Sequence, residues 1–179
     1  KPITKFAATI ERGEEAGVLF GKAMAAAAGG RPGAVHLELP EDVAEDIVEA
    51  EYVPERPAPM AIGAASTVLK EVIDIIEKAK HPILIIGAGA NRMPIQKELL
   101  AFVEKTKIPF ITTQMGKGAL DERSPLYIGT TALSVGDFVH KAIEQADVVI
   151  ALGHDSIEKP PAILLCGVQT IIHVNAYPT

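Results

Sequence analysis

The stretch His81–Ala90, "HPILIIGAGA", decides the fold of this chain. Its apolar run "PILII" is typical of a strand that is buried on both faces of a parallel sheet. Gly87 and Gly89 follow the run and predict a tight turn, and "PIQKELLAFVEKTK" (94–107) beyond it has the apolar spacing of a helix. A buried strand, a glycine turn and a helix in this order are the first part of a βαβ unit.

The same alternation continues on both sides of this stretch. An amphipathic helix is expected before it, over 67–80, with Ser66 as its N-cap. After it, the patterns predict a strand at 108–113, a helix at 135–146, and strands at 147–153 and 169–175. Alternating strands and helices indicate an α/β fold, an open doubly wound parallel sheet.

A separate block precedes this domain. "EEAGVLFGKAMAAAAGG" (14–30) predicts a helix, and "AVHLELP" (34–40) predicts a strand within the stretch "GRPGAVHLELPEDV". No strand pattern is recognised upstream, so residues 1–48 are expected to be disordered, docked non-natively or paired with another copy. The proline-rich segment 49–65 is interpreted as a linker, and 66–179 as the main domain.

The composition excludes several classes of function. The chain has 179 residues, of which 48% are hydrophobic, a net charge of −6 and no tryptophan. This charge argues against nucleic acid or an anionic membrane surface as a partner. A single cysteine excludes a disulfide within the chain and favours a reducing, cytoplasmic location.

Candidate ligand contacts lie in the loops that follow the predicted strands, because ligands of open α/β sheets bind at the carboxyl ends of the strands. "GAGANR" is a truncated dinucleotide fingerprint: Arg92 stands in place of its third glycine, and no acidic residue follows the second strand. We select residues from the loops after the four strands predicted at 82–86, 108–113, 147–153 and 169–175. These cofactor-binding candidates are Gly87, Gly89, Thr113, Gln114, Met115, Asp155 and Asn175. The sequence contains no catalytic constellation and no cluster with metal-ligand spacing, so neither kind of site is assigned.

The whole chain resembles thiamine-diphosphate-dependent enzymes of the acetolactate synthase group. The resemblance is carried by the order and spacing of "KPITKF…AMAAAAGGRPGAVHLELPEDV", "HPILIIGAGA", "FVEKTKIPFITTQMGKGALDERSPLYIG", "ADVVIALGHD" and "IIHVN". It implies that residues 1–48 are the C-terminal remnant of a pyrimidine-binding domain. Residues 66–179 would be a Rossmann-like central domain, with its C-terminus truncated.

The resemblance also implies what the intact enzyme does. It would decarboxylate a 2-oxo acid on thiamine diphosphate and Mg²⁺ and transfer the product to an acceptor. The activating glutamate and the Gly-Asp-Gly motif of the family are not found in this chain, which is therefore expected to be inert alone. Partners would be its own N- and C-terminal domains, further copies in a homodimer or homotetramer, and a regulatory subunit.

In acetolactate synthases the central domain carries FAD, and in other branches of the family it carries ADP or nothing. Carried over by position, flavin contacts would fall on Gly87, Gly89, Thr113, Gln114 and Met115. The sequence departs from the family where Asp155 replaces an arginine that contacts the flavin. A carboxylate there weakens the case for a diphosphate.

Two rival interpretations stay open. The domain could be a nucleotide-free structural spacer in another thiamine-diphosphate decarboxylase, an interpretation motivated by the missing third glycine and by Asp155. It could also be a stand-alone Rossmann domain that binds NAD. The missing ribose-binding acid and the additional N-terminal block argue against that second rival.

Overall fold

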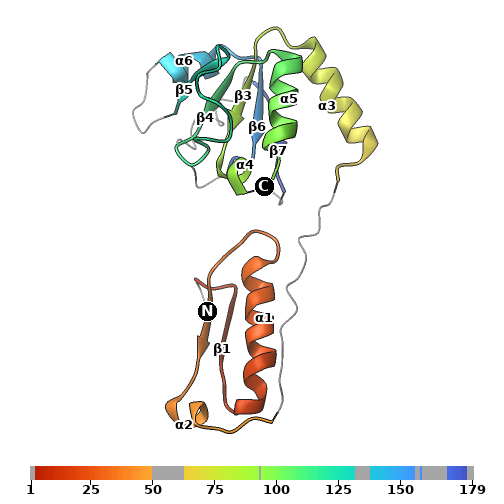
Figure 1. Ribbon diagram of the computed structural model, residues 1–179. Coiled ribbons are helices and arrows are strands. Elements are labelled where there is room, and N and C mark those ends of the chain that lie inside the picture. The colour runs from red at the N-terminus through yellow and green to blue at the C-terminus, as the bar shows by residue number, and fades with distance from the viewer. Residues whose placement is uncertain are drawn as a thin grey trace. The chain divides into compact units, whose positions relative to one another are not determined.

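The computed structural model describes residues 3–49, 63–92, 94–131, 138–155, 158 and 169–176. The chain divides into two compact units, residues 1–61 and 62–179, and each is described here by itself (Figure 1). Most of the expected linker lies outside the described residues, so its boundaries stay a prediction.

The first unit is a βαβ arrangement. Strands β1 and β2 pair in parallel, with Phe6 opposite Val35, and helix α1 connects them. The pairing extends past the strand ends, because the Ile10 amide donates to the Glu38 carbonyl at 2.9 Å. The elements of this unit are β1 (Phe6–Thr9), η1 (Gly13–Glu15), α1 (Ala16–Ala28), β2 (Val35–Glu38) and α2 (Glu41–Ala44).

The expectation that the strand in "AVHLELP" has no partner in its own chain is wrong. β1 is its partner, and both strands are ordered. β1 was not recognised because it has four residues, "FAAT", and alanine carries little of the β-branched or aromatic signal of a strand. The strand is nevertheless only half-covered: Val35 and Leu37 are half-buried, and Leu39 is 54% exposed.

The second unit is a five-stranded parallel sheet. Its strand order is β5-β4-β3-β6-β7, so β3, the first strand of this unit, lies at the centre and the order reverses between β3 and β6. This topology confirms the predicted doubly wound α/β fold. Its elements are α3 (Ser66–Lys78), β3 (Pro82–Ile86), α4 (Ala88–Arg92), α5 (Gln96–Thr106), β4 (Phe110–Thr112), β5 (Tyr127–Thr130), α6 (Phe138–Glu144), β6 (Val148–Leu152) and β7 (Thr170–Val174).

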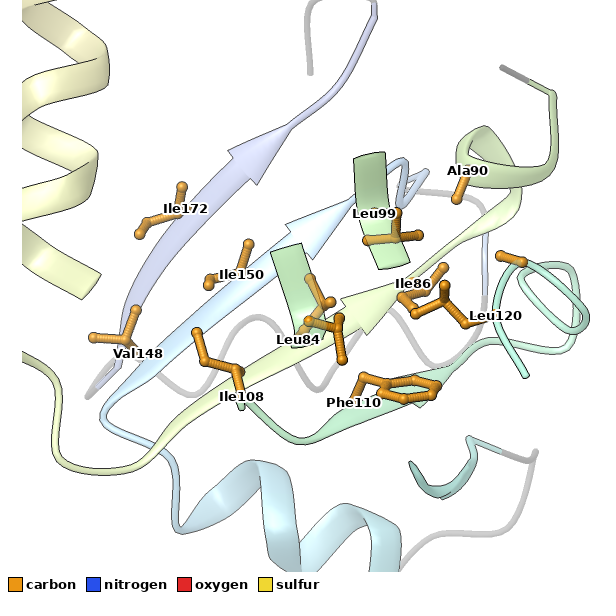
Figure 2. Close-up of a cluster of buried hydrophobic side chains, with 12 residues drawn as sticks. Leu84, Ile86, Ala90, Leu99, Ile108, Phe110, Leu120, Val148, Ile150 and Ile172 are labelled. Atoms are coloured by element: carbon orange, nitrogen blue, oxygen red, sulfur yellow. The ribbon is translucent and has the colours of Figure 1, made fainter. Parts of the chain in front are cut away.

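Helices cover both faces of this sheet, because alternate residues of each strand point to opposite faces. One face packs against α3 and α5, and its core includes Leu84, Ile86, Phe110 and Ile150, which Figure 2 shows gathered over the strands. The other face packs against α6 through Val139, Ile143 and neighbouring apolar residues. Burial on both faces explains why β3 and β6 read as continuous apolar runs.

The start of α3 and several short elements differ from the sequence-based expectations. Ser66 is the first residue of α3 rather than its cap; Ala65 occupies the N-cap position without a side-chain hydrogen bond. Strand β5 and the short helices η1, α2 and α4 were not predicted. Among the described residues, no helix combines the length and hydropathy needed to cross a membrane.

Candidate functional site at the carboxyl edge of the sheet

The candidate residues meet where the strand order of the sheet reverses. Chain order runs outward from β3 in one direction and from β6 in the other, and open α/β sheets bind ligands in the crevice at this point. Gly87 and Gly89 follow β3 there, and Gly153, His154 and Asp155 follow β6. The fold therefore brings two of the predicted loops, those after β3 and β6, to the position at which a ligand is expected.

The backbones of these two loops are in direct contact. The Gly89 amide donates to the Gly153 carbonyl at 2.8 Å, and the Gly87 amide donates to the Leu152 carbonyl at 2.9 Å. A Cβ atom on Gly89 would lie 2.7 Å from the Gly153 Cα atom, and one on Gly87 would lie 2.6 Å from the Gly153 carbonyl oxygen. Both glycines are thus required by packing of the chain against itself.

The carboxylate of Glu158 lies buried at the same position, with the residue 7% exposed. It accepts hydrogen bonds from the Ala88 amide at 3.0 and 3.1 Å and from the Asp155 amide at 2.9 Å. It also accepts one from the Thr113 hydroxyl at 2.5 Å. The donors come from the turn after β3, the loop after β6 and the end of β4, so one side chain connects three segments.

The loop after β4 is held in place by α4. The Asn91 side-chain amide donates to the carbonyl oxygens of Met115 and Lys117, each at 2.9 Å. The loop also approaches β3 closely, because a Cβ atom on Gly116 would lie only 2.0 Å from the Ile86 carbonyl oxygen. The "TTQMGKG" loop is therefore packed onto the edge of the sheet.

Asn175, which follows β7, holds the loop after β6 by a hydrogen bond. Its side-chain amide donates to the His154 carbonyl at 3.1 Å. The residue His154 is itself only 5% exposed, and burial lowers the pKa of its imidazole, an effect that the carboxylates of Glu158 and Asp155 partly oppose. The imidazole is therefore expected to be neutral at neutral pH.

The structure brings some of the predicted residues together and leaves others apart. Gly87, Thr113 and Asp155 surround Glu158, whereas Gln114 and Met115 are exposed. Asn175 contacts the backbone of His154. Whether any of these residues binds a cofactor stays a prediction.

Two residues of this site were missed in the sequence. Asn91 lies in the stretch "GAGANR" and Glu158 lies three residues after Asp155, but neither was selected. A usable signal was the spacing of Asp155 and Glu158, since a glutamate carboxylate often accepts a hydrogen bond from the backbone amide three residues before it. The Glu158 amide also donates to the Asp155 carbonyl at 2.9 Å, which forms such a turn.

The described residues do not fit the diphosphate of FAD or ADP. A diphosphate needs free amide donors or cations. Here the Ala88 and Asp155 amides already bond to Glu158, whose carboxylate would repel an anion. Lys117, in the loop after β4, pairs with Glu122 at 2.8 Å. Within the part of the chain that the structure describes, no three His, Cys, Asp or Glu side chains are grouped as metal ligands.

Comparison with known proteins identifies the family. The sequence model described as "Thiamine pyrophosphate enzyme, central domain" matches residues 69–179. The acetolactate synthase large subunit of Parasynechococcus marenigrum is 30% identical over 159 residues, which are 85% of this chain and 25% of that protein. The probable acetolactate synthase large subunit of Methanocaldococcus jannaschii is 33% identical, with 85% of this chain and 27% of that protein covered.

A relative with another activity matches equally well. The oxalyl-CoA decarboxylase of Escherichia coli is 30% identical over 159 residues, which are 86% of this chain and 27% of that protein. The chain therefore spans about a quarter of the length of these three relatives. The family match covers all of the five-stranded parallel sheet, and the chain belongs to the thiamine pyrophosphate enzymes, with residues 69–179 as their central domain.

Proposed function

We propose that the intact protein is a thiamine-diphosphate- and Mg²⁺-dependent 2-oxo acid decarboxylase or carboligase of the acetolactate synthase kind. The observation that carries this proposal is the central-domain match over 69–179, joined to relatives named acetolactate synthase and oxalyl-CoA decarboxylase. When bound, thiamine diphosphate supplies the carbanion chemistry that such a reaction requires. The cofactor would be held by parts of the protein outside this chain.

This chain would contribute a scaffold rather than reacting groups. Its sheet edge is closed by hydrogen bonds of Glu158, Asn91 and Asn175, and these bonds fix the loops between which a neighbouring domain would pack. FAD is not part of the proposal, because Glu158 takes the amides that a diphosphate would need. The chain alone would be inactive, because the activating glutamate and the Gly-Asp-Gly motif of the family are not found in it.

The remaining parts of the proposal concern assembly and location. Relatives about four times as long support additional domains on one or both sides of this chain. We propose a homodimer or homotetramer in the cytoplasm, with a regulatory subunit as a further partner. Size-exclusion chromatography with light scattering of the intact protein would measure this assembly.

The experiment that tests the proposed function measures release of CO₂ by the intact protein. Pyruvate and oxalyl-CoA are offered separately, with and without thiamine diphosphate and Mg²⁺. We expect release from one of them only when both the cofactor and the metal ion are present. The chain of residues 1–179, assayed in parallel, should release none. Absence of CO₂ from every 2-oxo acid and oxalyl substrate offered would contradict the proposal.

A further inference from the structure

We propose that Glu158 is a built-in anion: it occupies, from within the chain, the donors that a nucleotide diphosphate would need, and so makes this central domain nucleotide-free. The inference concerns binding and can be tested without any activity. It goes beyond the proposed reaction, which does not depend on whether a nucleotide is bound.

The first argument is the number of donors. A backbone amide has one hydrogen to donate, and so has a hydroxyl. The Ala88 amide, the Asp155 amide and the Thr113 hydroxyl all direct theirs to the Glu158 carboxylate. The bonds from the two amides, at 2.9 to 3.1 Å, are within the range of good hydrogen bonds, and bonds to a charged acceptor are stronger than neutral ones. A diphosphate could not bond to these groups unless Glu158 left.

The second argument is charge. Two negative unit charges about 4 Å apart repel each other strongly at the effective dielectric constant of a protein. This repulsion is enough to weaken the binding of a phosphate by roughly a thousandfold. Glu158 is 7% exposed, so water screens this repulsion poorly. A phosphate near the Ala88 amide would face this buried carboxylate directly.

The third argument is space. In dinucleotide-binding turns, glycines allow the backbone to approach a pyrophosphate. Here Gly87 and Gly89 instead admit the backbone of Gly153, whose carbonyl oxygen and Cα atom lie 2.6 and 2.7 Å from the positions of the added Cβ atoms. The glycines that suggested a ligand are thus explained by contact between the two loops.

The fourth argument is that the neighbours of Glu158 are fixed. The Glu158 amide donates to the Asp155 carbonyl, and Asn175 holds the adjacent His154 carbonyl at 3.1 Å. The Thr113 hydroxyl also accepts a hydrogen bond from the Gly116 amide at 3.0 Å, so its orientation toward Glu158 is set. Displacing the carboxylate would disturb all of these groups together.

The test uses the intact protein and two kinds of measurement. Binding of ADP and of FAD is measured by titration calorimetry, and flavin retained on purification is measured by visible absorbance. Deuterium exchange then follows the peptides that contain the Ala88 and Asp155 amides. The variants are Glu158→Gln and Glu158→Ala, with Glu104→Gln on the exposed side of α5 as the control.

We expect the wild-type protein to purify without flavin and to give no binding heat with ADP or FAD. In Glu158→Ala the two amides should exchange roughly 10- to 100-fold faster, since each loses a charge-assisted hydrogen bond. Glu158→Gln, which keeps the shape, should give a smaller increase, and Glu104→Gln none.

Three results would overturn the inference. One is flavin retained in stoichiometric amount by the wild-type protein, and another is ADP or FAD binding to it in the calorimeter. The third is unchanged exchange at both amides in Glu158→Gln and Glu158→Ala alike. If Glu158→Ala fails to fold, Glu158→Gln and the two wild-type binding measurements still decide the matter. Failure of the proposed catalytic activity would leave all of these readouts in place.

Discussion

Replacement of Gly116 by alanine is expected to destabilise the central domain strongly. A Cβ atom at this position would lie 2.0 Å from the Ile86 carbonyl oxygen, 2.8 Å from its carbon and 3.2 Å from the Gly87 Cα atom. All three are backbone atoms, so no side-chain rotation can relieve the contact. The φ angle of Gly116 is not positive, so the effect is steric rather than conformational.

The magnitude follows from what must move. Normal contact requires the loop and strand β3 to separate by roughly 1 Å, and overpacking of this kind costs about 1–3 kcal/mol. The Ile86 carbonyl also accepts the Thr113 amide at 2.9 Å, and losing that bond adds about 1 kcal/mol. Ile86 is fully buried, so strand β3 cannot relieve the contact by moving toward solvent. We expect Gly116→Ala to lower the free energy of unfolding by roughly 2–4 kcal/mol.

Urea unfolding of the chain, followed by circular dichroism, measures this change, and Gly118→Ala is the matched control. Gly118 lies in the same loop, has a φ of +82°, and has no atom within 4 Å of an added Cβ. Its replacement should cost only the left-handed backbone penalty, about 1–2 kcal/mol. Equal effects of the two substitutions, or a loss below about 1 kcal/mol for Gly116→Ala, would refute the packing described for this loop.

Three further predictions concern the core and two titrating groups. Phe110→Ala should lower the free energy of unfolding by about 3–5 kcal/mol, because the ring is 1% exposed, whereas Phe138→Ala, at 67% exposure, should change it little; urea midpoints measure both. Backbone amides of Lys80 and His81 hold the pKa of Asp147 below its usual value, so its contribution to stability is present above that usual value and is lost as the pH falls through the lowered pKa. Asp147→Asn should flatten this acid limb of the stability curve. Burial lowers the pKa of His154, so as the pH falls this imidazole binds a proton in the unfolded chain before it does so in the folded chain. The free energy of unfolding should therefore decrease as the pH drops below 6.5. A curve of stability against pH that is unchanged in His154→Gln would contradict that assignment.

The strands at the centre of the sheet could be predicted because their signal is local. β3 and β6 are buried on both faces and read as unbroken apolar runs, and α5 shows its buried positions at helical spacing. β1 and β5 could not be recognised in the same way. Each has four residues, none of which is fully buried, and β1 contains the small residues Ala7 and Ala8. Such strands are defined by their partners rather than by their own pattern.

The site was predictable as a place but not as a set of contacts. The rule that ligands lie at the carboxyl ends of parallel strands selected loops that the structure brings into contact at one edge of the sheet. The role of Glu158 depends on Ala88, 70 residues earlier, and on Thr113, 45 residues earlier. No local pattern encodes such distant partners, so the glycines of "GAGANR" suggested a ligand where the structure shows a carboxylate of the same chain.

The most direct test of the whole account is the rate of CO₂ release by the intact protein, measured with and without added FAD. The account predicts a rate that requires thiamine diphosphate and Mg²⁺ and that does not change when FAD is added. No release under any of these conditions would contradict the proposed function. A rate that depends on FAD would contradict the closed, nucleotide-free edge that Glu158 forms with Ala88, Thr113 and Asp155.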